Sequence, residues 1–184
     1  QSEELKMNLE EGVNKFLLLK NGNECFHEKN YHKINKILYE FGKNQYRPKK
    51  LFVLESLLKK MKNEDMFPCV CFLLSKKQIE ETAGQISTEI LEFDSKVAYT
   101  IEKECHSILR EKFPNFKEYL ELPELRSLIK LFEKGIAIHH SGMIPVLREL
   151  VEIFFEKGYI KLLFATETFS VGLNMPIRTT IFTD

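Results

Sequence analysis

The chain has 184 residues, of which 43% are hydrophobic, and its 27 Lys and Arg residues balance 27 Asp and Glu residues. This composition is typical of one globular domain and excludes a disordered, collagen-like or fibrous protein. Because the formal net charge is zero, any site for a polyanion has to be local. No apolar run reaches the roughly 20 residues of a membrane span, and residues 1–11 do not resemble a signal peptide, so we expect an intracellular protein with no membrane partner.

The first predicted elements are a strand and two helices. An apolar run at 15–20 is followed by Asn-Gly-Asn at 21–23, which predicts a strand that leaves through a tight turn. Apolar stripes at helical spacing within 31–41 and 51–61 predict two amphipathic helices. Lys and Arg exceed acidic residues over 42–62, which indicates either a solvated helix face or a contact with a phosphate backbone.

A buried strand and a capped helix are predicted next. The run CVCFLL at 69–74 is apolar throughout, as in a strand covered on both faces. Ser75 and Gln78 have the spacing of a helix capping box. The apolar stripe of the helix comprises Ile79, Ala83, Ile86 and Ile90. Cys69 and Cys71 lack the second pair that a zinc site needs, so we expect buried thiols.

The rest of the chain alternates helices and strands. Helical segments over 94–133 are interrupted at Pro114 and Pro123, and Gly135 is predicted to end the last of them. A further helix begins at Pro145 and stops before Gly158. Three more strands are predicted, at 136–139, 159–165 and 179–183. This alternation predicts an α/β fold in which helices cover both faces of a mostly parallel sheet.

Polar segments follow three of the predicted strands. Ligands of such sheets bind beyond the carboxyl ends of the strands, a rule that selects the segments 75–77, 139–142 and 166–174. Thr166, Thr168 and Ser170 supply three hydroxyls that suit a phosphate oxygen. Capping of a helical turn is an equal alternative for these hydroxyls.

The other two segments also offer donors to an anion. Ser141 and Gly142 provide a hydroxyl and an exposed amide, although a plain polar turn explains them as well. Lys76 and Lys77 lie at a helix start, where the helix dipole disfavours cations, and a bound anion would resolve that conflict.

Several catalytic motifs are missing from the sequence. There is no G-x-S-x-G, no H-E-x-x-H and no G-x-x-x-x-G-K-S/T. His139 and His140 are adjacent, and on an extended strand they would point to opposite faces, which disfavours a shared metal ion. We therefore predict no catalytic residue and no metal site within the chain.

Several segments of the chain resemble a known family. FATETFSVGLNMP at 164–176, together with GIAIHHSGMIPV and the residues that follow Gly135, resembles the second RecA-like domain of superfamily-two DExH RNA helicases. The similarity is to the exosome-associated branch, which includes the superkiller and TRAMP-type helicases. CVCFLLSKKQIEETA at 69–83 resembles motif IV of this family, and weaker similarity covers 16–34, whereas 88–121 fits poorly.

The resemblance implies roles for individual residues. The residues expected to contact RNA are Ser75, Lys76, His140, Ser141, Gly142, Thr166 and Thr168. The residues expected at the ATP cleft are Glu167, Gly172 and Asn174. The resemblance also implies one three-layer RecA-like domain over 1–184, with an entry strand and helix at 1–45 and a core at 46–184 that ends before motif VI.

The function implied is that of an ATP-dependent 3′ to 5′ RNA helicase that feeds or remodels RNA for the exosome, with a nuclear location preferred to a cytoplasmic one. The implied partners are single-stranded RNA, a preceding RecA-like domain of the same polypeptide and an exosome-associated complex. ATP and Mg²⁺ would be held with that preceding domain, so the chain alone should bind neither stably and lack ATPase activity. Two alternatives are a non-catalytic RecA-like scaffold module and an α/β enzyme acting on a small phosphorylated metabolite.

Overall fold

The computed structural model divides into two compact units, residues 1–53 and 54–184, and their boundary falls inside helix α3 (Lys50–Asn63). None of the helices in the described part of the chain is long and apolar enough to cross a membrane. The residues that the structure describes are 16–22, 25–45, 47, 49–88, 90, 95–166 and 175–183.

The first unit contains helix α2 (Glu28–Lys43) and a turn that precedes it. The strand predicted at 15–20 is wrong for its described residues, because only Lys20 pairs, in a single antiparallel bridge with Phe26. Next to that bridge, the side chain of Asn21 accepts a hydrogen bond of 3.0 Å from the amide of Cys25. Such a short two-stranded pairing is marginal by itself. The helix predicted within 31–41 is confirmed, but none of its residues is buried.

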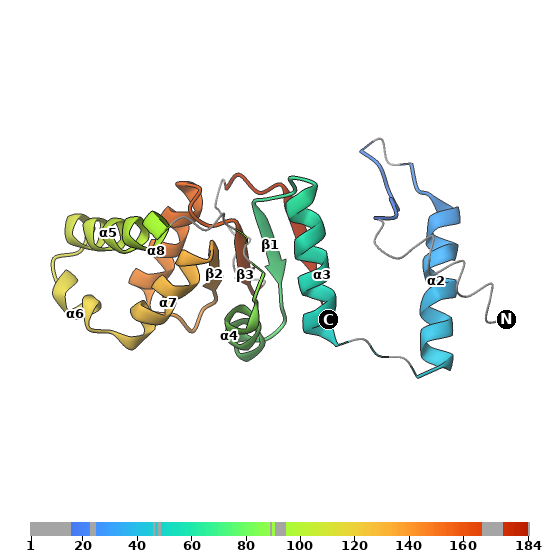
Figure 1. Ribbon diagram of the computed structural model, residues 1–184, viewed down its shortest axis with the longest axis horizontal. Coiled ribbons are helices and arrows are strands. Elements are labelled where there is room, and N and C mark those ends of the chain that lie inside the picture. The colour runs from blue at the N-terminus through green and yellow to red at the C-terminus, as the bar shows by residue number, and fades with distance from the viewer. Residues whose placement is uncertain are drawn as a thin grey trace. The chain divides into compact units, whose positions relative to one another are not determined.

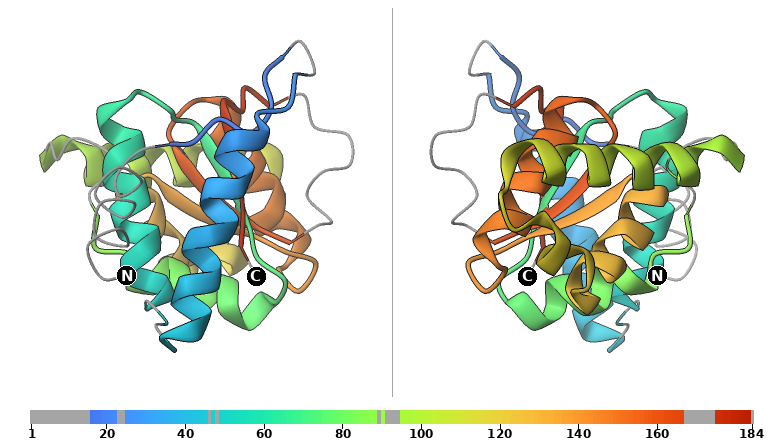
Figure 2. Two further views of the ribbon diagram at one scale, coloured as in Figure 1. Left: turned by 90° about the vertical axis from the view of Figure 1, so that its right-hand side faces the viewer. Right: turned by 90° about the vertical axis from the view of Figure 1, so that its left-hand side faces the viewer.

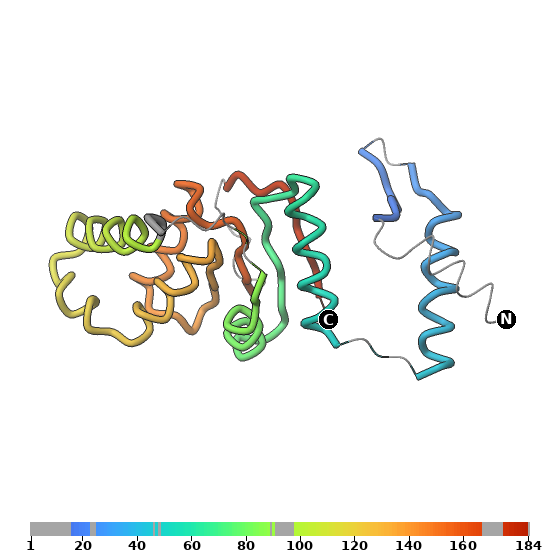
Figure 3. Tube along the Cα trace, in the orientation of Figure 1, coloured from blue at the N-terminus to red at the C-terminus, as the bar shows by residue number. Residues whose placement is uncertain are grey.

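The second unit contains the sheet, and all its pairings are parallel. Its strands are β1 (Cys69–Phe72), β2 (Ile136–His139), β3 (Leu162–Ala165) and β4 (Thr179–Phe182). They lie in the order β2-β3-β1-β4, and the path of the chain through them can be followed in Figures 1 and 3. The predicted α/β class with a parallel sheet is therefore confirmed.

Helices separate the first three strands along the chain. They are α4 (Lys76–Gln85), α5 (Ser95–Lys112), α6 (Phe116–Leu120), α7 (Pro123–Glu133) and α8 (Pro145–Glu156). The predicted breaks at Pro114 and Pro123 are confirmed. Pro123 and Pro145 are the first residues of their helices, a position where the backbone amide that proline lacks would have no helical partner. Gly135 follows the end of α7 with φ of +73°, as expected for a helix stop.

The sheet is buried on both faces, which makes three layers. Val70, Ala137 and Leu163 lie in one rung of the sheet and belong to a core with α5, α7 and α8. Alternate residues such as Cys71 and Phe164 are also fully buried, so they face the opposite side. Figure 1 shows α5, α7 and α8 on one side of the sheet and α3 on the other, and Figure 2 (right) views the unit from the side of α5.

Two elements are shorter at one end than predicted, for reasons of hydrogen bonding. The helix expected to continue to Ile90 ends at Gln85. The amide and hydroxyl of Ser87 both donate to the carboxylate of Glu55, at 2.7 and 2.5 Å, so tertiary partners replace the helical ones. The strand predicted from Tyr159 begins only at Leu162. The amide of Tyr159 instead donates to the carbonyl of Phe154 at the end of α8.

The first strand of the sheet ends earlier than predicted, and the last strand has nearly the predicted bounds. The run predicted as a strand to Leu74 stops at Phe72, and the Leu74 side chain is 77% exposed. The strand predicted at 179–183 spans Thr179–Phe182 and lies at the edge of the sheet among the described strands.

Candidate nucleic-acid interface

The polar segments after β1, β2 and β3 lie at one edge of the sheet. These three strands are neighbours and parallel, and Phe72, Ala165 and His139 occupy the same rung at their carboxyl ends. Two hydrogen bonds join the segments just beyond that rung. The amide of Leu73 donates to the carbonyl of Ala165 at 3.0 Å, and the amide of Thr166 donates to the carbonyl of His139 at 3.2 Å.

The segment after β1 begins helix α4. The Ser75 hydroxyl caps the helix by accepting a hydrogen bond of 3.1 Å from the amide of Gln78, as predicted. Ser75 and Lys76 are exposed, and the first turn of α4 contains no acidic residue. Lys77 pairs with Glu81 at 3.7 Å, an exposed contact that water screens. This helix end therefore presents its dipole and the Lys76 ammonium to solvent, which favours an anion.

The segment after β2 touches that helix start, although β3 separates their strands. Ser141 and Gly142 are exposed. A Cβ atom added to Gly142 would lie 3.2 Å from Cδ of Lys76 and 3.1 Å from Nδ1 of His140. Two exposed hydroxyls, those of Ser75 and Ser141, thus lie on segments that are in contact.

His140 lies beneath this turn and is only 3% exposed. Its Nδ1 accepts a hydrogen bond of 3.1 Å from the amide of Gly142. Its Nε2 lies 3.3 Å from Oε1 of Glu80 on α4, without a well-formed hydrogen bond. Burial lowers the pKa of His140, and the nearby Glu80 carboxylate opposes that effect only in part.

His139 points to the other side of the sheet. Its Nε2 lies 3.0 Å from Oε1 of Glu152 on α8. Burial lowers its pKa, while the contact with Glu152 acts in the opposite direction. The two histidines contact helices of different layers, so the prediction that they face opposite sides is confirmed. Among the described residues, no three His, Cys, Asp or Glu side chains gather to hold a metal ion.

The segment after β3 is described only at its two ends. Thr166 is half-buried directly after β3. The residues of the predicted site that lie outside the described part are Thr168, Glu167, Gly172 and Asn174, together with Ser170.

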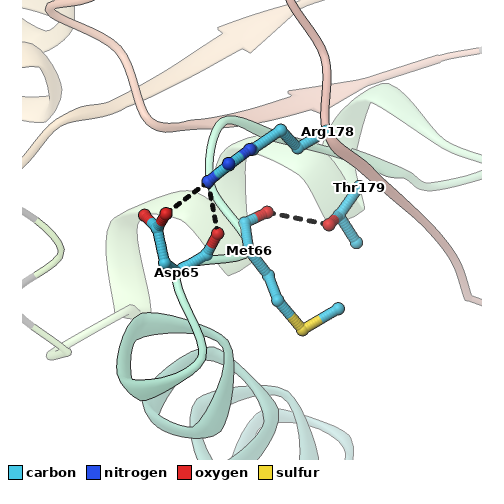
Figure 4. Close-up of polar contacts among 4 residues, drawn as sticks. All are labelled: Asp65, Met66, Arg178 and Thr179. Atoms are coloured by element: carbon cyan, nitrogen blue, oxygen red, sulfur yellow. Dashed lines mark hydrogen bonds and ion pairs between the residues drawn. The ribbon is translucent and has the colours of Figure 1, made fainter.

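The described residues beyond that segment are bound to the connection between α3 and β1 (Figure 4). The Arg178 guanidinium donates to the carbonyl and the carboxylate of Asp65, at 2.6 and 2.5 Å. The Thr179 hydroxyl donates to the carbonyl of Met66 at 2.7 Å. Sequence reasoning missed these contacts, because no local motif joins residues 113 positions apart, and it missed the long-range contact of Glu80 with His140 for the same reason.

The two cysteines of β1 belong to the core rather than to the exposed edge. Cys69 and Cys71 are fully buried, as predicted, and burial raises the pKa of each thiol to about 12. They are protonated at neutral pH and act as small apolar core residues.

The arrangement is one of hydrogen-bond donors rather than of reactive groups. Hydroxyls, amides and one ammonium group gather where three strands end, which suits an extended anion such as a phosphate backbone.

No family model matches the chain. It is, however, 44% identical over 127 residues to the antiviral helicase SKI2 of Saccharomyces cerevisiae, a match that covers 66% of the chain and 9% of the relative.

Two other relatives are RNA helicases by name. The ATP-dependent RNA helicase DExH9 of Arabidopsis thaliana is 40% identical over 119 residues, covering 64% of the chain and 11% of the relative. The human exosome RNA helicase MTR4 is 36% identical over 133 residues, covering 70% of the chain and 12% of the relative. The chain belongs to the DExH-box RNA helicases.

This DExH-box chain falls in the exosome-associated branch, as the resemblance predicted. It spans 9 to 12% of the length of these three relatives.

Proposed function

We propose that the chain is the second RecA-like domain of an ATP-dependent 3′ to 5′ RNA helicase that feeds or remodels RNA for the exosome. Its proposed part is to bind the RNA backbone with the segments after β1, β2 and β3. The proposed RNA contacts come from Ser75, Lys76, Ser141, Gly142 and Thr166, and Thr168 remains a predicted one. His140, which was also expected to contact RNA, is only 3% exposed and is not among them.

One observation carries this proposal. The three segments follow neighbouring parallel strands and are joined by the hydrogen bonds from Leu73 to Ala165 and from Thr166 to His139. Donors held along one edge suit a ligand that repeats its charge at regular intervals, as a sugar-phosphate chain does. The same arrangement explains how a chain of zero net charge can bind a polyanion, since its cationic and amide groups act locally.

The nucleotide has a separate proposed place. Glu167, Gly172 and Asn174 are proposed to face ATP, and they lie outside the described residues. ATP hydrolysis would supply the free energy for movement. Other parts of the full-length protein would hold ATP and Mg²⁺, so the chain alone is proposed to bind neither stably.

Thr166→Val in the full-length protein tests the role of the segment after β3. Loss of one hydrogen bond to a charged phosphate removes about 1.5–3 kcal/mol. We therefore expect the RNA concentration for half-maximal ATPase activity to rise about tenfold or more, with weaker unwinding of a duplex that carries a 3′ overhang.

Thr180→Val is the matched control, because Thr180 is an exposed residue within β4 rather than beyond a strand end. It should leave both activities unchanged. Equal effects of the two substitutions, or no effect of Thr166→Val, would remove Thr166 from the interface.

The alternatives differ in the wild-type measurements. A scaffold module would bind partners without RNA-stimulated ATPase activity. An enzyme for a small phosphorylated metabolite would bind that compound with little dependence on salt, whereas affinity for RNA should fall steeply as salt rises.

The partners and location of the protein follow the same proposal. Single-stranded RNA, a preceding RecA-like domain and an exosome-associated complex are the proposed partners. The preference for a TRAMP-type nuclear protein stays a prediction, because relatives of both kinds match the chain.

A further inference from the structure

We propose that His140 is a positioning residue, whose neutral imidazole holds the Ser141–Gly142 turn against the start of α4. Protonation of the ring would release the turn. The consequence for RNA rests on the proposed function: affinity at this edge of the sheet should fall in mild acid.

The hydrogen bond from Gly142 defines the protonation state that the turn needs. The Gly142 amide donates to Nδ1 of His140 at 3.1 Å, so this nitrogen has to carry a lone pair. In the imidazolium ion both ring nitrogens carry hydrogen, and two donors would then face each other. The Gly142 amide would lose its acceptor, and the turn would have to move.

Burial indicates that His140 acts through the turn rather than by touching RNA. The residue is 3% exposed, whereas Ser141 and Gly142 above it are exposed. The ring also reaches α4, where Nε2 lies 3.3 Å from Glu80. One imidazole thus contacts both the segment after β2 and the helix that follows β1.

The charged groups around the ring favour the neutral form on balance. Glu80 and Lys76 face it from α4, and His139 is its neighbour on β2. Glu80 favours the imidazolium ion, while Lys76, His139 and above all burial oppose it. At neutral pH the ring is therefore uncharged and can accept from Gly142.

Two substitutions separate the two contacts of the ring. In His140→Asn the side-chain oxygen occupies a position close to that of Nδ1 and can accept from Gly142, but the group no longer reaches Glu80. In His140→Gln the longer amide can reach Glu80, but the acceptor at the Nδ1 position is lost. Neither side chain titrates. His106→Asn, on α5, is the matched control for removal of a histidine.

Affinity for single-stranded RNA is measured on the full-length protein from pH 7.5 to 5.5. At pH 7.5 we expect His140→Asn to lose less affinity than His140→Gln, which should lose about fivefold or more because a buried amide is left without its acceptor. As the pH falls below 6.5, the wild type and the control should lose affinity relative to His140→Asn, because only they contain the ring that can be protonated. Equal losses in the two His140 variants, or identical pH profiles for the wild type and His140→Asn, would overturn the proposal.

Nuclear magnetic resonance without RNA tests the positioning role separately. The Nδ1 resonance of His140 should show an unprotonated nitrogen at pH 7.5, and the exchange protection factor of the Gly142 amide should fall as the ring protonates. A protonated Nδ1 at pH 7.5, or protection that does not change on acidification, would overturn the positioning role. If the wild type binds no RNA at any pH, the proposed function fails, while the protection measurement still decides the role of His140.

Discussion

Gly142→Ala tests the close approach between the segment after β2 and the start of α4. The added Cβ would lie 3.1 and 3.3 Å from Nδ1 and Cε1 of His140, and 3.2 Å from Cδ of Lys76. These separations are shorter than ordinary van der Waals contacts. Lys76 is exposed and can turn away, but His140 is 3% exposed and has no room to retreat.

The expected magnitude combines two opposing effects. Overpacking of a confined site costs about 1–3 kcal/mol. Alanine also restricts the unfolded chain, which returns about 0.4–1 kcal/mol where the backbone conformation is compatible. Since Gly142 does not adopt a left-handed conformation, that compensation applies. We expect a net loss of about 1 kcal/mol in the free energy of unfolding.

Gly84→Ala is the matched control, because it is the same substitution with the opposite expected sign. Gly84 lies within α4, and no atom lies within 4 Å of a Cβ added there. Alanine stabilises a helix by up to about 0.5–1 kcal/mol relative to glycine, and Gly84 lies in the last turn of α4. The two variants should therefore differ by about 1.5–2 kcal/mol.

Urea unfolding followed by far-ultraviolet circular dichroism measures this difference. With a urea dependence of about 1–3 kcal/mol per molar, the midpoints of the two variants should differ by about 1 M. A Gly142→Ala variant as stable as the wild type would show that the turn does not press against His140, and the reasoning about this contact would be wrong.

Three further predictions concern stability. Burial lowers the pKa of His139 and His140 below 6.5, so the unfolded chain binds more protons than the folded chain in mild acid. The free energy of unfolding should therefore be largest above pH 6.5 and fall as the pH drops below that value. His139→Gln should make the free energy of unfolding, measured with urea, depend less on pH between pH 7.5 and 5.5. Phe154→Ala removes a fully buried ring and should cost about 3–5 kcal/mol in urea, whereas Tyr99→Ala, at a side chain 68% exposed, should change stability by less than about 0.5 kcal/mol. Arg178→Ala breaks an exposed ion pair with Asp65, so the free energy of unfolding should fall by only about 1 kcal/mol or less. A larger loss would show that this contact stabilises more of the fold than the start of β4.

The sequence itself determined the order of the elements and most of their boundaries in the second unit. The strands β1, β2 and β3, with helices between them, followed from apolar runs, because a strand covered on both faces needs apolar side chains at every position. Pro123, Pro145 and Gly135 placed helix ends correctly, since their backbone restrictions act locally and do not depend on the rest of the fold.

Local patterns failed where a distant group supplied or withheld a hydrogen bond. Helix α4 ends early because Ser87 is bound to Glu55 on α3, a contact that the spacing of Ile86 and Ile90 does not reveal. The apolar run at 15–20 has strand composition, yet among its described residues, 16–20, only Lys20 forms a bridge. A strand is stabilised by its neighbour, and composition does not state whether a neighbour exists.

Part of the candidate interface could be predicted from the sequence, and part required the tertiary structure. The sequence indicated which segments carry hydroxyls, amides and cations, because these lie directly after apolar runs. Only the tertiary structure decided that β1, β3 and β2 are neighbours, that Lys76 meets Gly142 and that His140 is buried between Gly142 and Glu80. Sheet order and burial arise from packing between residues far apart in the chain, so a pattern read along the chain does not contain them.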